Sequence, residues 1–253
     1  MNKPILENTP VVNGYLSTEI QTAQVIEINN YTEDIFRKKF VSKVYSTLWI
    51  QLLFTSVYIG LCNQIPQLQK FLLSPIGINL MYVSIFSILL SSCCLFGYYE
   101  KLKITPYNYL YVFFFTIMMS YSLGLVGLMY NPQVLLLSGL STTGIFSGLT
   151  IYAIQTKIDY TIYGNIGIIM LFGLLFFGLM ISFLQIQMLQ IIYSIGGASL
   201  FSFYIVYDTQ LITGGSERKI TYTIDDWAIA SVNLYLDVVN LFLFLLDIMG
   251  GRN

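Results

Sequence analysis

Long apolar stretches separated by short polar segments occupy the chain from residue 45 to residue 249. A helix needs about 20 predominantly apolar residues to cross the hydrocarbon core of a bilayer. Seven stretches have roughly that length, so we predict an all-α membrane protein, a bundle of seven transmembrane helices. The predicted spans are residues 45–62, 76–98, 108–129, 134–154, 163–184, 188–211 and 228–249.

The composition supports this fold class. Hydrophobic residues make up 56% of the 253 residues and charged residues only 10%, against about 25% charged in soluble globular proteins. Residues 1–35, by contrast, are polar and mildly acidic and contain no apolar core. We therefore predict a disordered tail over residues 1–35 and one transmembrane domain over residues 36–253.

The basic residues are distributed unevenly between alternate loops. With the N-terminus in the cytosol, ten of the twelve Lys and Arg residues lie on the cytosolic side, as the positive-inside rule requires. These ten are Lys3, Arg37, Lys38, Lys39, Lys43, Lys101, Lys103, Lys157, Arg218 and Lys219. The opposite side holds Lys70 and Arg252 if the last span crosses fully, and we predict a cytosolic N-terminus.

Histidine is absent, and the three cysteines, Cys62, Cys93 and Cys94, all lie within predicted spans. An odd number of cysteines inside apolar helices does not indicate a disulfide framework, so we interpret them as packing residues. Without histidine the commonest metal ligand and the usual pH switch near neutrality are both missing. We expect no resident metal and no cofactor, and proton sensing would have to use carboxylates.

The last span carries a polar stripe. Asn233, Asp237 and Asn240 recur at i, i+4 and i+7, which places them on one face of a helix. Asp237 lies about 15 Å into the span at 1.5 Å per residue, near the middle of a bilayer, where a charged carboxylate is costly. Such a stripe must face protein or water, and it marks a candidate functional site.

A second acid, Asp208, lies near the cytosolic end of the preceding span, about 9 Å deep. If the two helices touch, Asp208 and Asp237 form a pair that cannot easily ionise twice, so we expect a shared proton and a proton-sensitive ion gate. Asn233 and Asn240 would be polar neighbours of that gate. Hard oxygen ligands suit Ca²⁺ or H⁺ as the ion. In the alternative reading, the two acids are only solvated or hydrogen-bonded within the bundle.

Asp247 lies ten residues beyond Asp237, about 80° away from it around the helix. We expect an interfacial position near the far end of the last span. Asp247 is also a candidate for lining an exit from the bundle.

Four ordered blocks are distributed along the chain from residue 36 onward: residues 36–45 leading into 51–55, then 149–161, 207–215 and 233–242. The last two are the most specific and read Tyr-Asp-Thr-Gln-Leu-Ile-Thr-Gly-Gly and Asn-Leu-Tyr-Leu-Asp-Val-Val-Asn-Leu-Phe. In this order the blocks resemble the transmembrane Bax inhibitor motif family, in its lifeguard branch.

The resemblance implies a seven-helix bundle with the last helix central. It further implies a pH-sensitive Ca²⁺ leak channel in the endoplasmic reticulum, the Golgi or related membranes, which regulates calcium and suppresses cell death. The family's carboxyl dyad falls on Asp208 and Asp237. Bacterial relatives add a basic residue in span two, but residues 76–98 contain no Lys or Arg, and Lys101 and Lys103 lie just beyond. The implied partners are membrane lipids, calcium ions, protons and other membrane proteins, with no nucleic acid.

Three other functions stay open. The bundle could be a scaffold for membrane partners without intrinsic flux, or a proton-coupled transporter. An intramembrane aspartyl protease also needs two acids on adjacent helices, and Tyr207-Asp208 fits half of that pattern. Asp237, however, follows Leu-Tyr-Leu and not the Gly-x-Gly context of such enzymes, and the other spans contain no Pro-Ala-Leu motif. We therefore expect a protein that is not an enzyme and has no catalytic residues.

Overall fold

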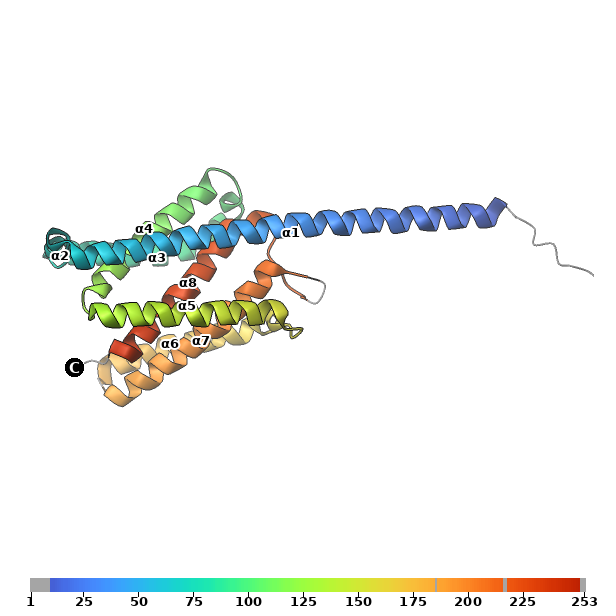
Figure 1. The fold of residues 1–253 in the computed structure, drawn as a ribbon. Helices are drawn as coiled ribbons and strands as arrows, with labels where there is room; N and C mark the ends of the chain where they lie inside the picture. Colours follow the sequence, from blue (N-terminus) through green and yellow to red (C-terminus); the bar gives the residue numbers. More distant parts are fainter. Residues whose placement is uncertain (1–9, 185, 216–217, 251–253) are drawn as a thin grey trace, which may run out of the picture. The chain divides into compact units, whose positions relative to one another are not determined.

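The computed structural model describes residues 10–184, 186–215 and 218–250, with side chains from residue 31 onward except for residues 93–96. Every regular element in these ranges is helical (Figure 1). Seven of the described helices are long and apolar enough to cross a membrane, which confirms the predicted fold class. The elements are α1 (Pro10–Gln64), α2 (Pro66–Leu72), α3 (Pro75–Leu102), α4 (Tyr107–Gly127), α5 (Pro132–Gln155), η1 (Tyr160–Tyr163), α6 (Gly164–Leu184), α7 (Gln187–Thr213), η2 (Ile224–Asp226) and α8 (Trp227–Gly250).

Proline and small polar residues set several of the helix boundaries. Pro75 and Pro132 occupy the first turns of α3 and α5, where the missing N–H costs nothing. The side chains of Ser74 and Asn131 accept hydrogen bonds from the backbone of those turns and cap them. Asn131 follows the end of α4 by only a few residues, so a short connection leads from α4 into α5.

The chain divides into two compact units, Met1–Lys39 and Phe40–Asn253. In the first unit residues 10–39 are helical, whereas we predicted a disordered tail over residues 1–35. Pro10 starts the helix, and no proline follows it in this unit to break the hydrogen-bond ladder. Residues 1–9, which include Lys3, lie outside the described residues.

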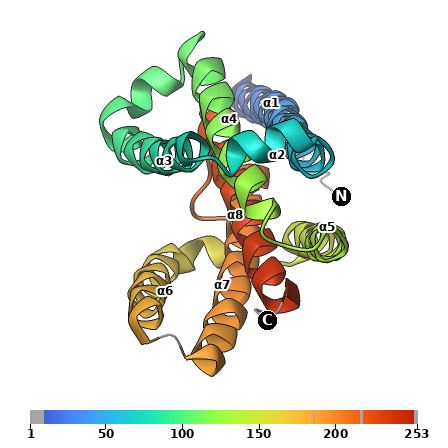
Figure 2. The same ribbon diagram turned by 90° about the vertical axis from the view of Figure 1, so that its left-hand side faces the viewer.

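In the second unit α8 packs against α4, α5 and α7 (Figure 2). In the most apolar stretch of α8, 67% of the residues are buried, compared with 11% in the corresponding stretches of α3 and α6. Tyr235 and Leu234 of α8 are fully buried, and both belong to a core cluster that also contains Phe115 of α4. The 24 residues of α8 extend about 36 Å at 1.5 Å per residue, enough to cross a core of about 30 Å.

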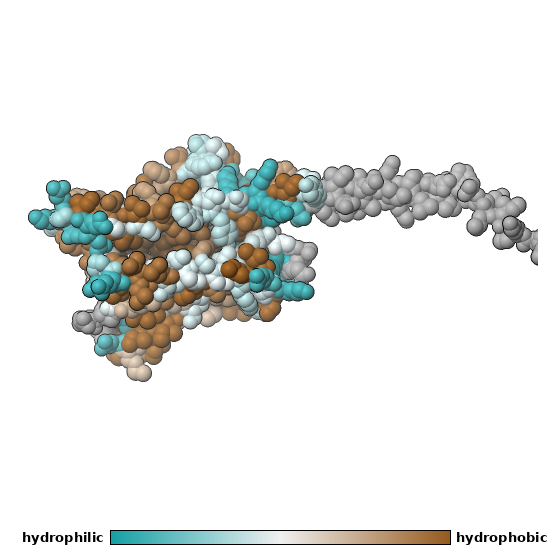
Figure 3. All heavy atoms as spheres, viewed as in Figure 1, coloured by the Kyte–Doolittle hydropathy of each residue, from teal (hydrophilic) through white to brown (hydrophobic). Residues whose placement is uncertain are grey.

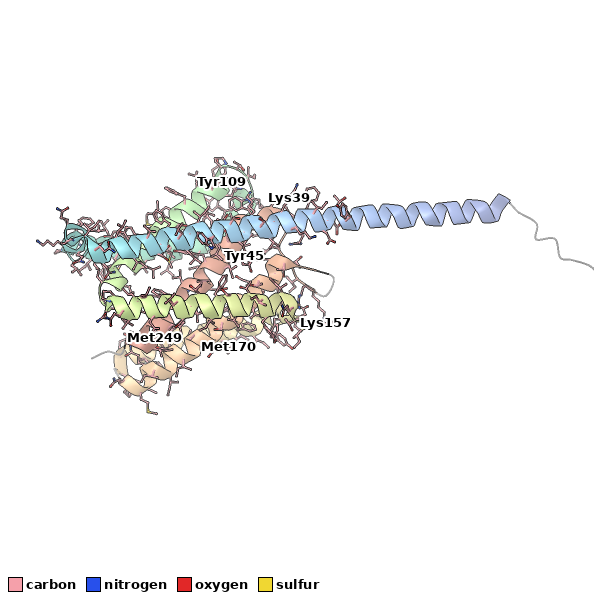
Figure 4. All side chains as sticks on the ribbon, viewed as in Figure 1. Lys39, Tyr45, Tyr109, Lys157, Met170 and Met249 are labelled. Atoms are coloured by element: carbon pink, nitrogen blue, oxygen red, sulfur yellow. The ribbon has the colours of Figure 1, made fainter. Side chains whose placement is uncertain are left out.

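On the face of the bundle that Figure 3 shows, hydrophobic side chains lie between two hydrophilic ends. Large apolar side chains of α6 are exposed there, for example Ile169 at 70% and Phe183 at 87%. Such a surface is stable against acyl chains and not against water. We call the end of the bundle near Lys157, which follows α5, and Arg218, which follows α7, the basic end. The end near Met249, in the last turn of α8, is the opposite end; Figure 4 labels Lys157 and Met249.

Candidate functional site: a buried carboxyl pair

Asp208 of α7 and Asp237 of α8 lie together inside the bundle. Their side chains are only 6% and 7% exposed, and the two carboxyl groups are within hydrogen-bonding distance of each other. Oδ2 of Asp237 is buried and accepts no hydrogen bond from any described N–H or O–H donor. Two carboxylates cannot hydrogen-bond to each other unless one carries a proton, so the contact is stable only with a shared proton.

Tyrosine hydroxyl groups surround the pair. Tyr204 and Tyr207 of α7 and Tyr222 of the loop between α7 and α8 all interact electrostatically with Asp208. No described Lys or Arg is among the groups that act electrostatically on the two acids. Neutral phenol groups therefore lie near the pair, and no basic partner occurs in its described surroundings.

Tyr222 reaches the pair because the loop folds back over the end of α7. Its backbone N–H donates to the carbonyl of Leu211 at 3.0 Å, and its hydroxyl accepts a hydrogen bond from Nδ2 of Asn233 at 2.9 Å. Burial raises the pKa of Tyr222 well above its ordinary value, and the charge of Asp208 raises it further. The phenol therefore stays neutral at any physiological pH, and Tyr222 links the loop to α8.

Gln210 fastens the same turn of α7 to the end of α5. Its Nε2 donates to the carbonyls of Ala153 and Ile158, and its Oε1 accepts from the backbone N–H of Tyr160. The side chain is fully buried. Because Gln210 lies two residues beyond Asp208, these bonds fix the position of Asp208 relative to α5.

Arg218 makes a second connection to the same segment. Its guanidinium donates to the carbonyls of Ala153, Thr156 and Ile158, which have no helical partner at the end of α5. A positive charge at a helix C-terminus is also favourable for the helix dipole. The loop between α7 and α8 is thus anchored to α5 by its basic residue.

Asp159 completes this connection. Its carboxylate accepts hydrogen bonds from the hydroxyl and the N–H of Thr161 and from the backbone N–H of Lys219. Burial alone would raise the pKa of Asp159, but these hydrogen bonds and the charge of Arg218 outweigh it and lower the pKa. Asp159 is therefore ionised at physiological pH.

The first turn of α8 is held by a separate polar cluster. Asp226 forms a capping box with Thr223, accepts a hydrogen bond from the hydroxyl of Tyr99 at 2.7 Å, and lies 3.8 Å from Nζ of Lys103. Lys103 also pairs with Glu100 at 3.1 Å. Lys103 directly follows α3, the second predicted span. Its ion pairs stabilise the start of α8 and do not reach the carboxyl pair.

Asn240 and Asp247 of α8 lie together at a different place, a cavity between α6, α7 and α8. Asn240 donates to the carbonyl of Leu236 at 2.8 Å. The carboxylate of Asp247 accepts hydrogen bonds from Ser194 at 2.5 Å and from Gln190 at 3.3 Å. Asn240 therefore extends the polar stripe away from the pair, toward Asp247.

The structure thus brings Asp208, Asp237 and Asn233 to one site and places Asn240 and Asp247 at a second one. Sequence reasoning missed Tyr222, which no apolar span contains. Its aromatic ring in a polar loop was the one available signal.

No group of three or more Asp, Glu, Cys or His side chains that could hold a metal ion occurs among the described residues. Arg252 and the side chains of Cys93 and Cys94 lie outside the described residues.

Fold and site together define a multi-pass integral membrane protein whose last two spans hold a buried pair of acids. Comparison with known proteins gives the family. The sequence model of the family described as "Inhibitor of apoptosis-promoting Bax1" matches residues 37–253, so the chain belongs to that family.

Three relatives illustrate the range of the family. Human Protein lifeguard 3 is 26% identical over 247 residues, which cover 95% of this chain and 78% of the relative. Mouse Protein lifeguard 3 is 25% identical, with 86% and 70% covered. Protein LIFEGUARD 2 of Arabidopsis thaliana is 31% identical over 222 residues, 84% of this chain and 87% of the relative. The resemblance to the lifeguard branch is thereby confirmed.

Proposed function

We propose that this protein is a pH-sensitive calcium leak channel of internal membranes, in which Asp208 and Asp237 form the gate. The observation that carries the proposal is the contact between two buried carboxyl groups from different spans. A protein that only packed helices together would be more stable with apolar residues at these positions. A pair of acids whose contact depends on a proton has the properties of a switch.

The switch follows from simple electrostatics. With one proton between them, the carboxyl groups hydrogen-bond and hold α7 against α8. When the proton is lost, two like charges face each other in a medium of low dielectric constant and repel. The absence of a basic partner among the described neighbours leaves that charge for a cation to neutralise. Carboxylate, amide and hydroxyl oxygens are the ligands that Ca²⁺ prefers.

The uneven distribution of basic residues supports an orientation with the basic end and the N-terminus in the cytosol. In that orientation Asp208 and Tyr222 are near the cytosolic side, and Asp247 is near the lumen of the endoplasmic reticulum or Golgi. Membership of a family described as inhibitors of apoptosis supports a role in the control of cell death, which a calcium leak from these stores would serve. The function requires no catalytic step, so we propose a channel and not an enzyme.

Calcium flux into proteoliposomes that hold the purified chain tests the proposal. Flux is measured from about pH 5 to about pH 8 for the wild type, Asp208→Asn and Asp237→Asn. Asp225→Asn is the matched control, because this substitution removes the same charge at an exposed residue that precedes α8. We expect flux that changes with pH in the wild type and the control, and a flattened pH dependence in both gate variants. Flux equal to that of empty liposomes at every pH would contradict the proposal and favour a scaffold without intrinsic flux.

A further inference from the structure

A cavity of about 1200 Å³ lies between α6, α7 and α8, away from the carboxyl pair. Polar side chains from all three helices line it: Ser182 of α6, Gln187 and Gln190 of α7, and Asn240 and Asp247 of α8. Gln187 begins α7, and Asp247 is near the end of α8, so the polar residues gather at the opposite end of the bundle. We call this space the vestibule.

Among the described residues, the carboxylate of Asp247 is the only acidic group that lines the vestibule, and it is held in place. Ser194 and Gln190 of α7 donate to its two oxygens, one each. A carboxylate can accept about four hydrogen bonds, so lone pairs remain on both oxygens. Support of a ligand by hydrogen bonds from neighbouring residues is a recurrent property of ion sites.

Asp247 forms no ion pair with a described Lys or Arg, and the two described donors to its carboxylate are both neutral. Burial of its charge in acyl chains with such donors alone would be costly. The vestibule is therefore a place for water and not for a lipid tail. Its volume greatly exceeds the share of about 30 Å³ that one water occupies, so a hydrated ion fits.

From these observations we propose that the vestibule is a low-affinity binding site for a divalent cation, with Asp247 as its anionic ligand. The amide oxygens of Gln187 and Gln190 and the hydroxyl of Ser182 are the same class of hard ligand that Ca²⁺ takes, together with waters. With one carboxylate, the dissociation constant is expected on the order of 10⁻⁴–10⁻³ M, the range of weakly charged calcium sites.

The site also fits the entrance of the proposed leak, and this part of the inference rests on the proposed function. Asn240 lies one helical turn from Asp237, so the vestibule approaches the pair closely along α8. Aromatic rings pack beside Asp247: Phe244 and Tyr193 both line the vestibule. Phe244 contacts Tyr193 at 5.4 Å and stacks on Phe201 at 5.8 Å between ring centroids. A cation bound at Asp247 would remain in the vestibule until the bundle opens.

Terbium luminescence tests the binding site without any need for flux. Tb³⁺ replaces Ca²⁺ at oxygen sites and emits when a nearby tyrosine absorbs, and Tyr193 lines the vestibule. The full chain in detergent is titrated with Tb³⁺, and Ca²⁺ is then added as a competitor. We expect saturable emission that Ca²⁺ reverses, and Asp247→Asn should raise the half-saturating Tb³⁺ concentration about tenfold or more, because the only carboxylate is lost.

Control variants test whether binding depends on Asp247. Tyr193→Phe should lower the emission, while the exposed Asp225→Asn should leave the titration unchanged. Asp247→Glu keeps the charge and should retain binding, which excludes a folding defect as the cause of the loss. An unchanged titration in Asp247→Asn would overturn the proposal, because binding would then not depend on this carboxylate.

Different results would contradict the proposed leak and the proposed vestibule site. Terbium binding that depends on Asp247, in a protein without calcium flux, supports the site and contradicts the leak. Flux in a protein whose terbium binding ignores Asp247 supports the leak and contradicts the site. If both hold, Asp247→Asn should raise the calcium concentration for half-maximal flux while its pH dependence stays that of the wild type.

Discussion

Removal of the Tyr222 hydroxyl should make the proposed leak faster. In the structure this hydroxyl accepts a hydrogen bond from Asn233 of α8 at 2.9 Å, while the backbone of Tyr222 is bonded to Leu211 of α7. The side chain therefore ties α8 to the loop that follows α7. Tyr222→Phe deletes this bond and keeps both the ring and the backbone contact.

The size of the effect follows from the net free energy of one such bond, about 0.5–1.5 kcal/mol. If the bond exists only while α7 and α8 are together, its loss shifts the balance toward the open arrangement by about 2-fold to about 13-fold. Burial and the charge of Asp208 keep the pKa of Tyr222 far above neutrality, so the phenol itself does not titrate in the assay. Because a proton holds the pair closed, easier opening should move the switch toward lower pH, by up to about one pH unit for a 13-fold change. Calcium flux into proteoliposomes at several pH values measures both quantities.

Tyr107→Phe is the matched control, because the ring of Tyr107 is 54% exposed at the start of α4. It should leave the flux at the wild-type rate. Flux in Tyr222→Phe that equals or falls below the wild-type rate would refute the reasoning, since the bond would then not stabilise the closed arrangement. A switch displaced toward higher pH would contradict it as well, because a weaker closed arrangement should open more easily.

Two further predictions concern stability. A Cβ at Gly197 would overlap the ring of Phe244, whereas at Gly196 it would meet nothing within 4 Å. Gly197→Ala should therefore be less stable than Gly196→Ala by about 1–3 kcal/mol, measured by thermal unfolding in detergent, and equal stabilities would contradict the packing. The pKa of Asp159 is lowered, so its contribution is present above the unfolded value of 3.8 and is lost as pH falls through the folded value. Asp159→Asn should destabilise the protein at neutral pH, and the difference should disappear as pH falls through the lowered folded-state pKa; a difference that does not change with pH would contradict the assignment.

The sequence predicted the spans and the two principal acids because both depend on the cost of placing groups in lipid. Asp208 and Asp237 stand out as charges in apolar helices, and the proximity of their helices in sequence favoured contact. The structure brings the two carboxyl groups together. Whether a pH-sensitive gate results is the subject of the proposed flux experiment and stays a prediction.

The rest depends on tertiary contacts that no periodicity encodes. Tyr222 reaches Asn233 only because the loop folds back onto Leu211, and a polar loop of this length has many other paths. Asp247 is about 80° from Asp237 around the helix but, as i and i+7, only about 20° from Asn240. The comparison with Asp237 alone therefore concealed that Asn240 and Asp247 line one cavity.

The contacts of Gln210 and Arg218 have a consequence for long-range regulation. Through five backbone carbonyl bonds and one backbone N–H bond, these two side chains join the end of α5 and the segment before η1 to α7 and its following loop. Asp208 thus belongs to a rigid block, and Asp237 belongs to the helix that packs against it. A ligand, partner or modification that displaces the exposed segment around Lys157 would act allosterically, because it would move one half of the carboxyl pair without touching either acid.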